Sequence, residues 1–261
     1  MSNNIEITNI EIKRKTISLT FSNGETLKIT PSVYSEYYLY TGKKIEPEEI
    51  KAIKKASEQA KLRDYAFNLF ARASYTTEEI RKKLRTRKAS KSTIDTIIKQ
   101  LENAQLLDDR QYAMEKCAYL QASHRGPRYI ENDLKRRGIA GDIIEEVLSK
   151  PFDYEETAKQ YALKASKNIN ARNNKDLKNK LTNQLLNRGF YNAHINVALE
   201  IIPPLEEGKI LKKLKLDYEK AKRRYEKKYE GYELNNRLFK YLSQRGYNYN
   251  EINEIITKEE N

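Results

Sequence analysis

A short basic phrase occurs four times in this chain, at nearly regular intervals. Three copies end in Arg-Gly and one ends in Arg-Lys; they are Leu84–Lys88, Leu134–Gly138, Leu185–Gly189 and Leu242–Gly246. Their first leucines lie 50 (84 to 134), 51 (134 to 185) and 57 (185 to 242) residues apart. An isoleucine follows the last residue of every phrase at +6, as Ile94, Ile144, Ile195 and Ile252. This periodicity predicts a tandem array, and arrays more often bind extended partners than catalyse.

The apolar spacing after about Pro47 is helical, with three helices in each repeat. The expected helices are 60–73, 77–88 and 91–104; 109–123, 127–137 and 141–149; 153–170, 175–188 and 192–202; and 205–230, 233–245 and 248–258. Thr76 and Glu79 form a capping-box pattern before one of them, and Asp108 or Asp109 can cap another. We therefore predict a connecting helix at 46–60, followed by repeats at 61–106, 107–150, 151–203 and 204–261.

The first 45 residues follow a different pattern. Apolar residues alternate with polar ones between residues 5 and 30, and Asn23-Gly24 interrupts them. This pattern predicts a β-hairpin region of two or three strands, with tyrosines 34, 37, 38 and 40 available to pack against it. The predicted fold is mainly α: an elongated tandem array of about four three-helix repeats with a small N-terminal β-hairpin or sheet.

The glycines that close the repeated phrases have a structural interpretation. Gly138, Gly189 and Gly246 each follow a basic residue at a predicted helix end, where a left-handed residue closes the last turn. This leaves the arginines before them free for another role. In the second repeat, Gly126 permits a close backbone approach and Pro127 begins a helix.

Composition favours acidic partners and gives no sign of catalysis. Fifty basic and 37 acidic residues give a net charge of +13, which makes nucleic acid a plausible partner. The single cysteine, Cys117, fits a buried hydrophobe, and the two histidines, His124 and His194, lie far apart in the sequence. No phosphate-binding loop, Cys-x-x-Cys pair or zinc motif is present. We expect no enzyme, no catalytic residue, no metal and no cofactor.

Targeting signals are also missing from the sequence. The chain does not begin with a basic region followed by an apolar one, and no apolar run approaches the roughly 18 residues that a bilayer requires. We expect a soluble, cytoplasmic monomer with no membrane contact.

One segment of the second repeat has the residues of a binding surface. Lys135 and Arg136 follow Arg128 by 7 and 8 residues, so the three lie near one face of a helix. With Arg125 they form the predicted main contact, which Arg72 and Arg81 of the first repeat extend. Such cations suit carboxylates or successive phosphates. An exposed basic helix without a partner is the other interpretation, and the charged segment 209–230 is the other candidate surface.

Three segments together resemble the RecX family, the bacterial regulators of the RecA recombinase. They are Ala66–Thr76 with Glu79–Leu84, Leu106–Ala113, and Arg125–Ile139. The resemblance covers about residues 62–148 and is weaker in the later repeats. It implies a non-enzymatic protein that lies in the groove of the RecA–DNA filament. The resemblance further implies that the protein, often an inhibitor, blocks ATP-driven strand exchange and repressor cleavage or promotes filament disassembly, with effects on recombination, DNA repair and the SOS response. The residues do not fix the sign of the effect, because inhibition and activation need the same contacts.

Two other function classes remain open at this point. The chain could be a sequence-nonspecific nucleic-acid-binding helical repeat protein, which binds single- or double-stranded DNA weakly. It could also be a scaffold without nucleic-acid contact. Of these two, only the nucleic-acid-binding protein would show salt-sensitive DNA binding. A regulator of RecA would differ from both, because its binding to single-stranded DNA would become much tighter when RecA is present.

Overall fold

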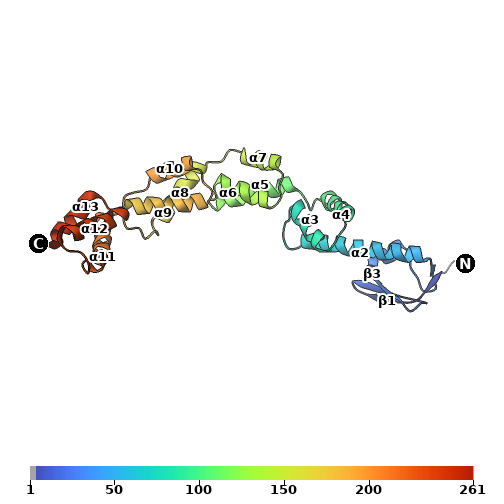
Figure 1. Cartoon of the computed structure of the whole chain (residues 1–261). Helices are drawn as coiled ribbons and strands as arrows, with labels where there is room; N and C mark the ends of the chain where they lie inside the picture. Colours follow the sequence, from blue (N-terminus) through green and yellow to red (C-terminus); the bar gives the residue numbers. More distant parts are fainter. Residues whose placement is uncertain (1–3, 261) are drawn as a thin grey trace. The chain divides into compact units, whose positions relative to one another are not determined.

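The computed structural model describes residues 4–260, in which we find thirteen helices and four strands (Figure 1). The fold is mainly helical, as predicted. The chain forms two compact units. One contains the residues up to Met114 with Lys135–Ile143, and the other contains Glu115–Leu134 with the residues from Ile144 onward. No helix within residues 4–260 combines the length and apolar character needed to cross a membrane.

A four-stranded antiparallel sheet opens the first unit. Its strands are β1 (Ile5–Lys13), β2 (Thr16–Phe21), β3 (Thr26–Ile29) and β4 (Lys44–Ile45), in the order β3-β2-β1-β4. The predicted hairpin around Asn23-Gly24 is confirmed, with Gly24 at φ +83° in the connection. The expectation that β structure ends near residue 30 is wrong, because β4 pairs with the start of β1 through Ile5 and Ile45. A two-residue strand is too short to show an alternating pattern.

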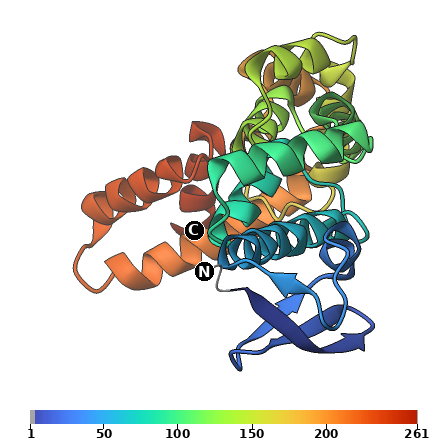
Figure 2. The same ribbon diagram turned by 90° about the vertical axis from the view of Figure 1, so that its right-hand side faces the viewer.

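The sheet packs against α2 (Pro47–Leu69), as Figure 2 shows. Fully buried Ile7, Leu19, Ile29 and Ile45 form a common core with Ile53 of α2. This core supplies the apolar burial that an isolated hairpin lacks in water.

The tyrosines that follow the hairpin divide into two pairs. Tyr34 lies in α1 (Pro31–Glu36), a helix the sequence did not predict, and packs on the sheet core with Tyr37. Tyr38 and Tyr40 are 82% and 61% exposed, so the expectation of packing is wrong for them.

The first repeat continues from α2 through α3 (Thr77–Thr86) and α4 (Lys91–Asn103). The helices predicted at 46–60 and 60–73 are one continuous helix, since neither Gly nor Pro occurs between Pro47 and Leu69 to interrupt it. The Thr76–Glu79 capping box is confirmed at the start of α3. Buried Ala66, Ile80, Leu84, Ile94, Ile97, Ile98, Leu101 and Leu107 form the core of this repeat.

The remaining helices follow the predicted order. They are α5 (Asp109–Ala122), α6 (Pro127–Arg136), α7 (Gly141–Leu148), α8 (Tyr154–Ser166), α9 (Asn174–Asn187), α10 (Asn192–Glu200), α11 (Glu207–Tyr225), α12 (Gly231–Gln244) and α13 (Tyr249–Glu260). Asp108 is the residue that caps α5, since its Oδ1 accepts the Gln111 N–H at 2.9 Å. The helix predicted at 205–230 is shorter, because Glu226, Lys227 and Lys228 are exposed and add no packing.

Candidate partner-binding surface

One hydrogen bond recurs between successive repeats. The residue immediately before the middle helix of a repeat donates to the backbone carbonyl of the phrase arginine in the next repeat. We call these bonds the first, second and third inter-repeat contacts. They are Thr76 Oγ1 to Arg137 O at 2.6 Å, Gly126 N to Arg188 O at 2.8 Å, and Asn173 Nδ2 to Arg245 O at 3.0 Å. Each satisfies a carbonyl at a helix end, where no intrahelical partner is available.

Glycine is required at these contacts for two separate reasons. Gly138, Gly189 and Gly246 have φ values of +79°, +85° and +89°, which confirms the predicted left-handed helix ends. A Cβ at Gly189 would lie 2.2 Å from Tyr129 N, and a Cβ at Gly126 would lie 2.4 Å from the Gly189 carbonyl carbon. The close approach predicted at Gly126 is therefore confirmed, and the approaching backbone belongs to the third repeat of the same chain.

The first phrase is the exception, and its place in the chain explains it. Lys88 is left-handed at φ +60°, so the helix ends as in the other phrases. No three-helix repeat precedes it within residues 4–260, so no backbone has to approach this position. A side chain is tolerated there at the conformational cost of a left-handed non-glycine residue.

The phrase arginines are not free, contrary to the expectation from sequence. Arg137 Nη1 lies 3.0 Å from Glu79 Oε1 of the first repeat. Arg188 Nη1 donates to the carbonyls of Ser123 at 3.0 Å and His124 at 3.1 Å. These side chains hold successive repeats together.

A tyrosine supports each phrase arginine. The four guanidinium carbons lie 3.6 to 5.9 Å from a ring centroid, in the pairs Arg87–Tyr65, Arg137–Tyr112, Arg188–Tyr161 and Arg245–Tyr241. Cation–π attraction thus fixes the arginines. This role was not predicted from the sequence, although an arginine and an earlier tyrosine recur in the first three repeats.

The third inter-repeat contact has a charged centre. Asp217 Oδ2 accepts the Tyr247 hydroxyl at 3.1 Å and lies 3.6 Å from Arg172 Nε and 3.8 Å from Arg245 Nε. Burial and the Asp217 charge raise the pKa of Tyr247 above its ordinary value, so this phenol stays protonated and donates. The charge of Asp217 therefore holds two cations and one phenol from different parts of the second unit.

Arg125 and Arg128 flank the start of α6 but differ in exposure. Half-buried Arg125 places its guanidinium carbon 4.3 Å from the centre of the Tyr129 ring. Exposed Arg128 donates its backbone N–H to Gly189 O at 3.1 Å, which leaves its side chain to solvent. The second inter-repeat contact thus fixes the backbone of Arg128, a residue that is exposed.

Lys135 and Arg136 end α6 and are both exposed. The helix spans both of them and Arg128, so the predicted helical spacing is present. The helix dipole also stabilises cations in the last turn of a helix. We call Arg128, Lys135 and Arg136 the α6 cation strip.

The two predicted contact residues of the first repeat differ in exposure. Arg72 is exposed in the turn after α2. Arg81 is half-buried and paired with Asp95 of α4. An external partner would have to compete with that carboxylate for Arg81.

Two reactive residue types lie in structural positions. Cys117 is 3% exposed, and burial raises the pKa of its thiol. The thiol therefore stays protonated and packs as a small apolar side chain. The His194 ring stacks on Tyr154 with centroids 6.0 Å apart, and its Nδ1 is buried without a hydrogen-bond partner. The prediction that Cys117 is a buried hydrophobe is confirmed.

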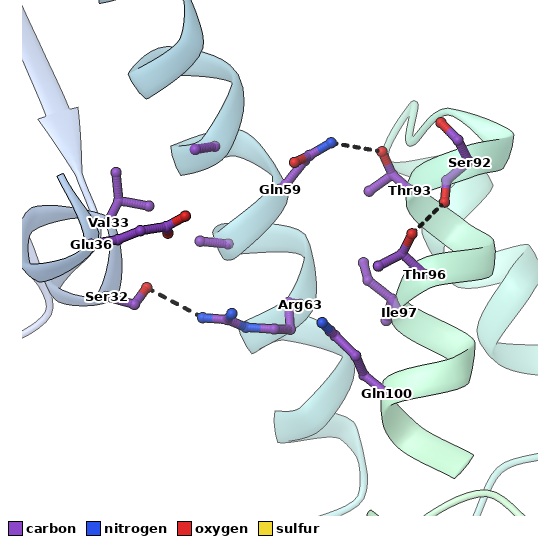
Figure 3. Close-up of a pocket in the computed structure, with 12 residues that line it drawn as sticks. Ser32, Val33, Glu36, Gln59, Arg63, Ser92, Thr93, Thr96, Ile97 and Gln100 are labelled. Atoms are coloured by element: carbon purple, nitrogen blue, oxygen red, sulfur yellow. Dashed lines mark hydrogen bonds between the residues drawn. The ribbon is translucent and has the colours of Figure 1, made fainter. Parts of the chain in front are cut away.

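A polar cleft of about 360 Å³ lies between α1, α2 and α4 (Figure 3). Gln59 donates to Thr93 Oγ1 at 3.4 Å and Arg63 donates to Ser32 Oγ at 3.2 Å. Among the described residues that line it, Glu36 is the one carboxylate and no histidine or cysteine occurs. Within residues 4–260 no group of three or more His, Cys, Asp or Glu is arranged to hold a metal.

Comparison with known proteins identifies the second repeat. Residues 108–148 match the model of the second three-helix domain of RecX, which includes α6 and its cation strip. A regulatory protein RecX of Streptococcus gordonii is 28% identical over 255 residues, which cover 97% of this chain and 98% of that protein. Another regulatory protein RecX, from Streptococcus pneumoniae serotype 19F, is 27% identical over 251 residues, covering 95% and 97%.

A solved structure shows a similar fold. The crystal structure of a regulatory protein RecX has a TM-score of 0.58 and 23% sequence identity, and it covers 75% of this chain and 99% of that one. At this identity the likeness concerns the fold alone.

Proposed function

We propose that this chain, which belongs to the RecX family, regulates the RecA recombinase by binding the RecA–DNA filament and inhibiting it. The observation that carries the proposal is the near full-length similarity to proteins named regulatory protein RecX. The match to the second three-helix domain of RecX covers residues 108–148, which contain the α6 cation strip.

The proposed contact is electrostatic and centred on the second repeat. Arg128, Lys135 and Arg136 are exposed, with Arg125 beside them, and cations of this kind fit carboxylates or phosphates along a filament groove. A protein bound in that groove would impede ATP hydrolysis, strand exchange and repressor cleavage. Recombination, DNA repair and the SOS response would change as a result.

A sequence-nonspecific nucleic-acid-binding protein is the second candidate. The net charge of +13 favours it, because basic proteins release counterions when they bind phosphate backbones. The two functions differ in the role of RecA. If the filament is the target, binding to single-stranded DNA becomes much tighter when RecA and a nonhydrolysable nucleotide are added.

The test reverses the charge of the α6 cation strip. We expect R128E/K135E/R136E to weaken inhibition of RecA-driven ATP hydrolysis and strand exchange strongly, because like charges would then meet across the interface. Its helicity should stay unchanged, since exposed substitutions usually alter stability by less than about 0.5 kcal/mol each. Titration of both RecA assays, with circular dichroism of each variant, measures the outcome.

The matched control is K51E/K54E/K55E, whose three lysines are exposed on α2. Three reversals remove six charges, so both triple variants have a net charge of +7 instead of +13. The control should inhibit like the unmodified protein. Equal inhibition by all three proteins would place the contact elsewhere, with the charged α11 the next candidate.

A further inference from the structure

A basic groove lies in the first unit, between the β1–β2 turn and the C-terminal half of α2. It has a volume of about 690 Å³, and Arg14 and Lys15 of the turn line it opposite Lys61 and Arg63 of α2. None of these residues belongs to the predicted contact surface, and the RecX second-domain match does not include them. The groove therefore needs its own explanation.

The four cations are available to a ligand in different degrees. Arg14 and Lys15 are exposed in the two-residue turn that joins β1 to β2. Lys61 Nζ donates to Lys28 O at 3.3 Å, and Arg63 Nη2 donates to Ser32 Oγ at 3.2 Å, as Figure 3 shows for Arg63. An ammonium has three donors and a guanidinium five, so these single bonds fix the two α2 cations without exhausting their donors.

The lining is strongly positive and includes an aromatic ring. Among the described residues that line the groove, Asp64 is the one carboxylate, and its Oδ1 lies 3.6 Å from Arg63 Nε, so four cations face one anion. Half-buried Phe67 and exposed Asn68 continue the α2 wall one turn further along. Cations around an aromatic ring are the combination that binds single-stranded nucleic acid, in which unpaired bases can stack.

We propose that this groove binds the phosphodiester backbone of single-stranded nucleic acid, with Arg14, Lys15, Lys61 and Arg63 contacting phosphates. Two guanidinium groups match phosphate oxygens in bidentate geometry, and the part of Phe67 that lines the groove is the proposed contact for a base. An acidic protein segment would use the cations but not the ring. The inference gives the proposed DNA contact a specific site, and it is tested without RecA, so its failure and that of the proposed function are distinguishable.

The test measures fluorescence anisotropy of a labelled oligothymidylate with the full-length protein across a salt series. R14E/K15E should raise the Kd by at least about tenfold, because two attractive contacts become repulsive. In R14A/K15A the slope of log affinity against log salt should become shallower by about 1.4, since each lost phosphate contact removes about 0.7. Both residues lie in an exposed turn, so circular dichroism should show unchanged folding.

The matched control is K51E/K54E, which makes the same charge change at two exposed sites. Both lie on α2, the helix that forms one wall of the groove, but outside the groove itself. Its Kd should stay within about twofold of the unmodified protein. An unchanged Kd in R14E/K15E, or equal weakening in R14E/K15E and the control, would overturn the proposal. So would loss of RecA inhibition in R14E/K15E with unchanged DNA binding, which would assign the groove to an acidic protein partner.

Discussion

The second and third inter-repeat contacts join repeats in the same way but with different chemistry. At the second, backbone meets backbone: Gly126 N donates to Arg188 O, and Arg128 N donates to Gly189 O. At the third, the Asn173 side chain provides the hydrogen bond, and charges around Asp217 surround it.

This difference shows that the same contact between repeats can depend on the absence of a side chain at a glycine or on the charges of the side chains around it. A Cβ at Gly246 would meet only side-chain atoms, at 3.3 Å or more, whereas a Cβ at Gly189 would overlap the Tyr129 backbone. Flexible side chains can move away and backbone cannot. The second contact should therefore be insensitive to salt but lose much stability when a methyl group is added. The third should weaken in salt and, with a methyl group at Gly246, lose little more than the cost of a left-handed alanine.

The largest expected effect is that of Gly189→Ala. A left-handed alanine costs about 1–2 kcal/mol, and overlap with Tyr129 N at 2.2 Å adds to this. We expect a loss of more than about 3 kcal/mol in the free energy of unfolding, unchanged by salt. Urea unfolding followed by circular dichroism measures it.

Gly208→Ala is the control for this substitution. Gly208 lies near the start of α11, and a Cβ there would have no neighbour within 4 Å. This variant should be neutral or up to about 1 kcal/mol more stable, since alanine favours helices. If Gly189→Ala unfolded within about 1 kcal/mol of the unmodified protein, the contact would be able to relax and the comparison would fail.

A smaller effect is expected for Asp217→Asn at the third contact. The amide keeps the shape of the side chain but leaves Arg172 and Arg245 without their shared carboxylate. Because the Asp217 side chain is 15% exposed, we expect a loss of about 1–3 kcal/mol in low salt. Added salt should narrow this difference, and urea unfolding at two salt concentrations tests it. A salt-independent loss would mean that packing, not charge, holds this contact.

The sequence predicted those features that follow from one helix or one turn at a time. The left-handed glycines, the Thr76 capping box and the start of α6 at Pro127 depend on neighbours within a few residues. The fold class followed from the repeated pattern. The partners of Arg137 and Arg188 did not, because Glu79 is 58 residues from Arg137 in the sequence and His124 is 64 from Arg188.

The candidate surface was predictable in part for the same reason. The exposure of Arg128, Lys135 and Arg136 follows from helical spacing, and it is observed. The pairing of Arg81 with Asp95 depends on how α4 packs beside α3, and the groove at Arg14 depends on how the sheet packs on α2. Local patterns in the sequence do not specify such packing between elements.

The smallest expected effect concerns the phrase that no repeat precedes. Lys88 adopts φ +60°, a conformation that costs a non-glycine residue about 1–2 kcal/mol, whereas glycine loses about 0.5–1 kcal/mol through its greater freedom when unfolded. Lys88→Gly should therefore stabilise the chain by up to about 1 kcal/mol, seen as a higher urea midpoint. Gly138→Lys, in the equivalent position of the second repeat, should destabilise it, because its Cβ would lie 2.4 Å from Glu78 Cβ. Opposite signs would show that glycine at a phrase end serves both the turn and the contact with the preceding repeat. A loss of stability in Lys88→Gly would mean that the Lys88 side chain makes a stabilising contact of its own.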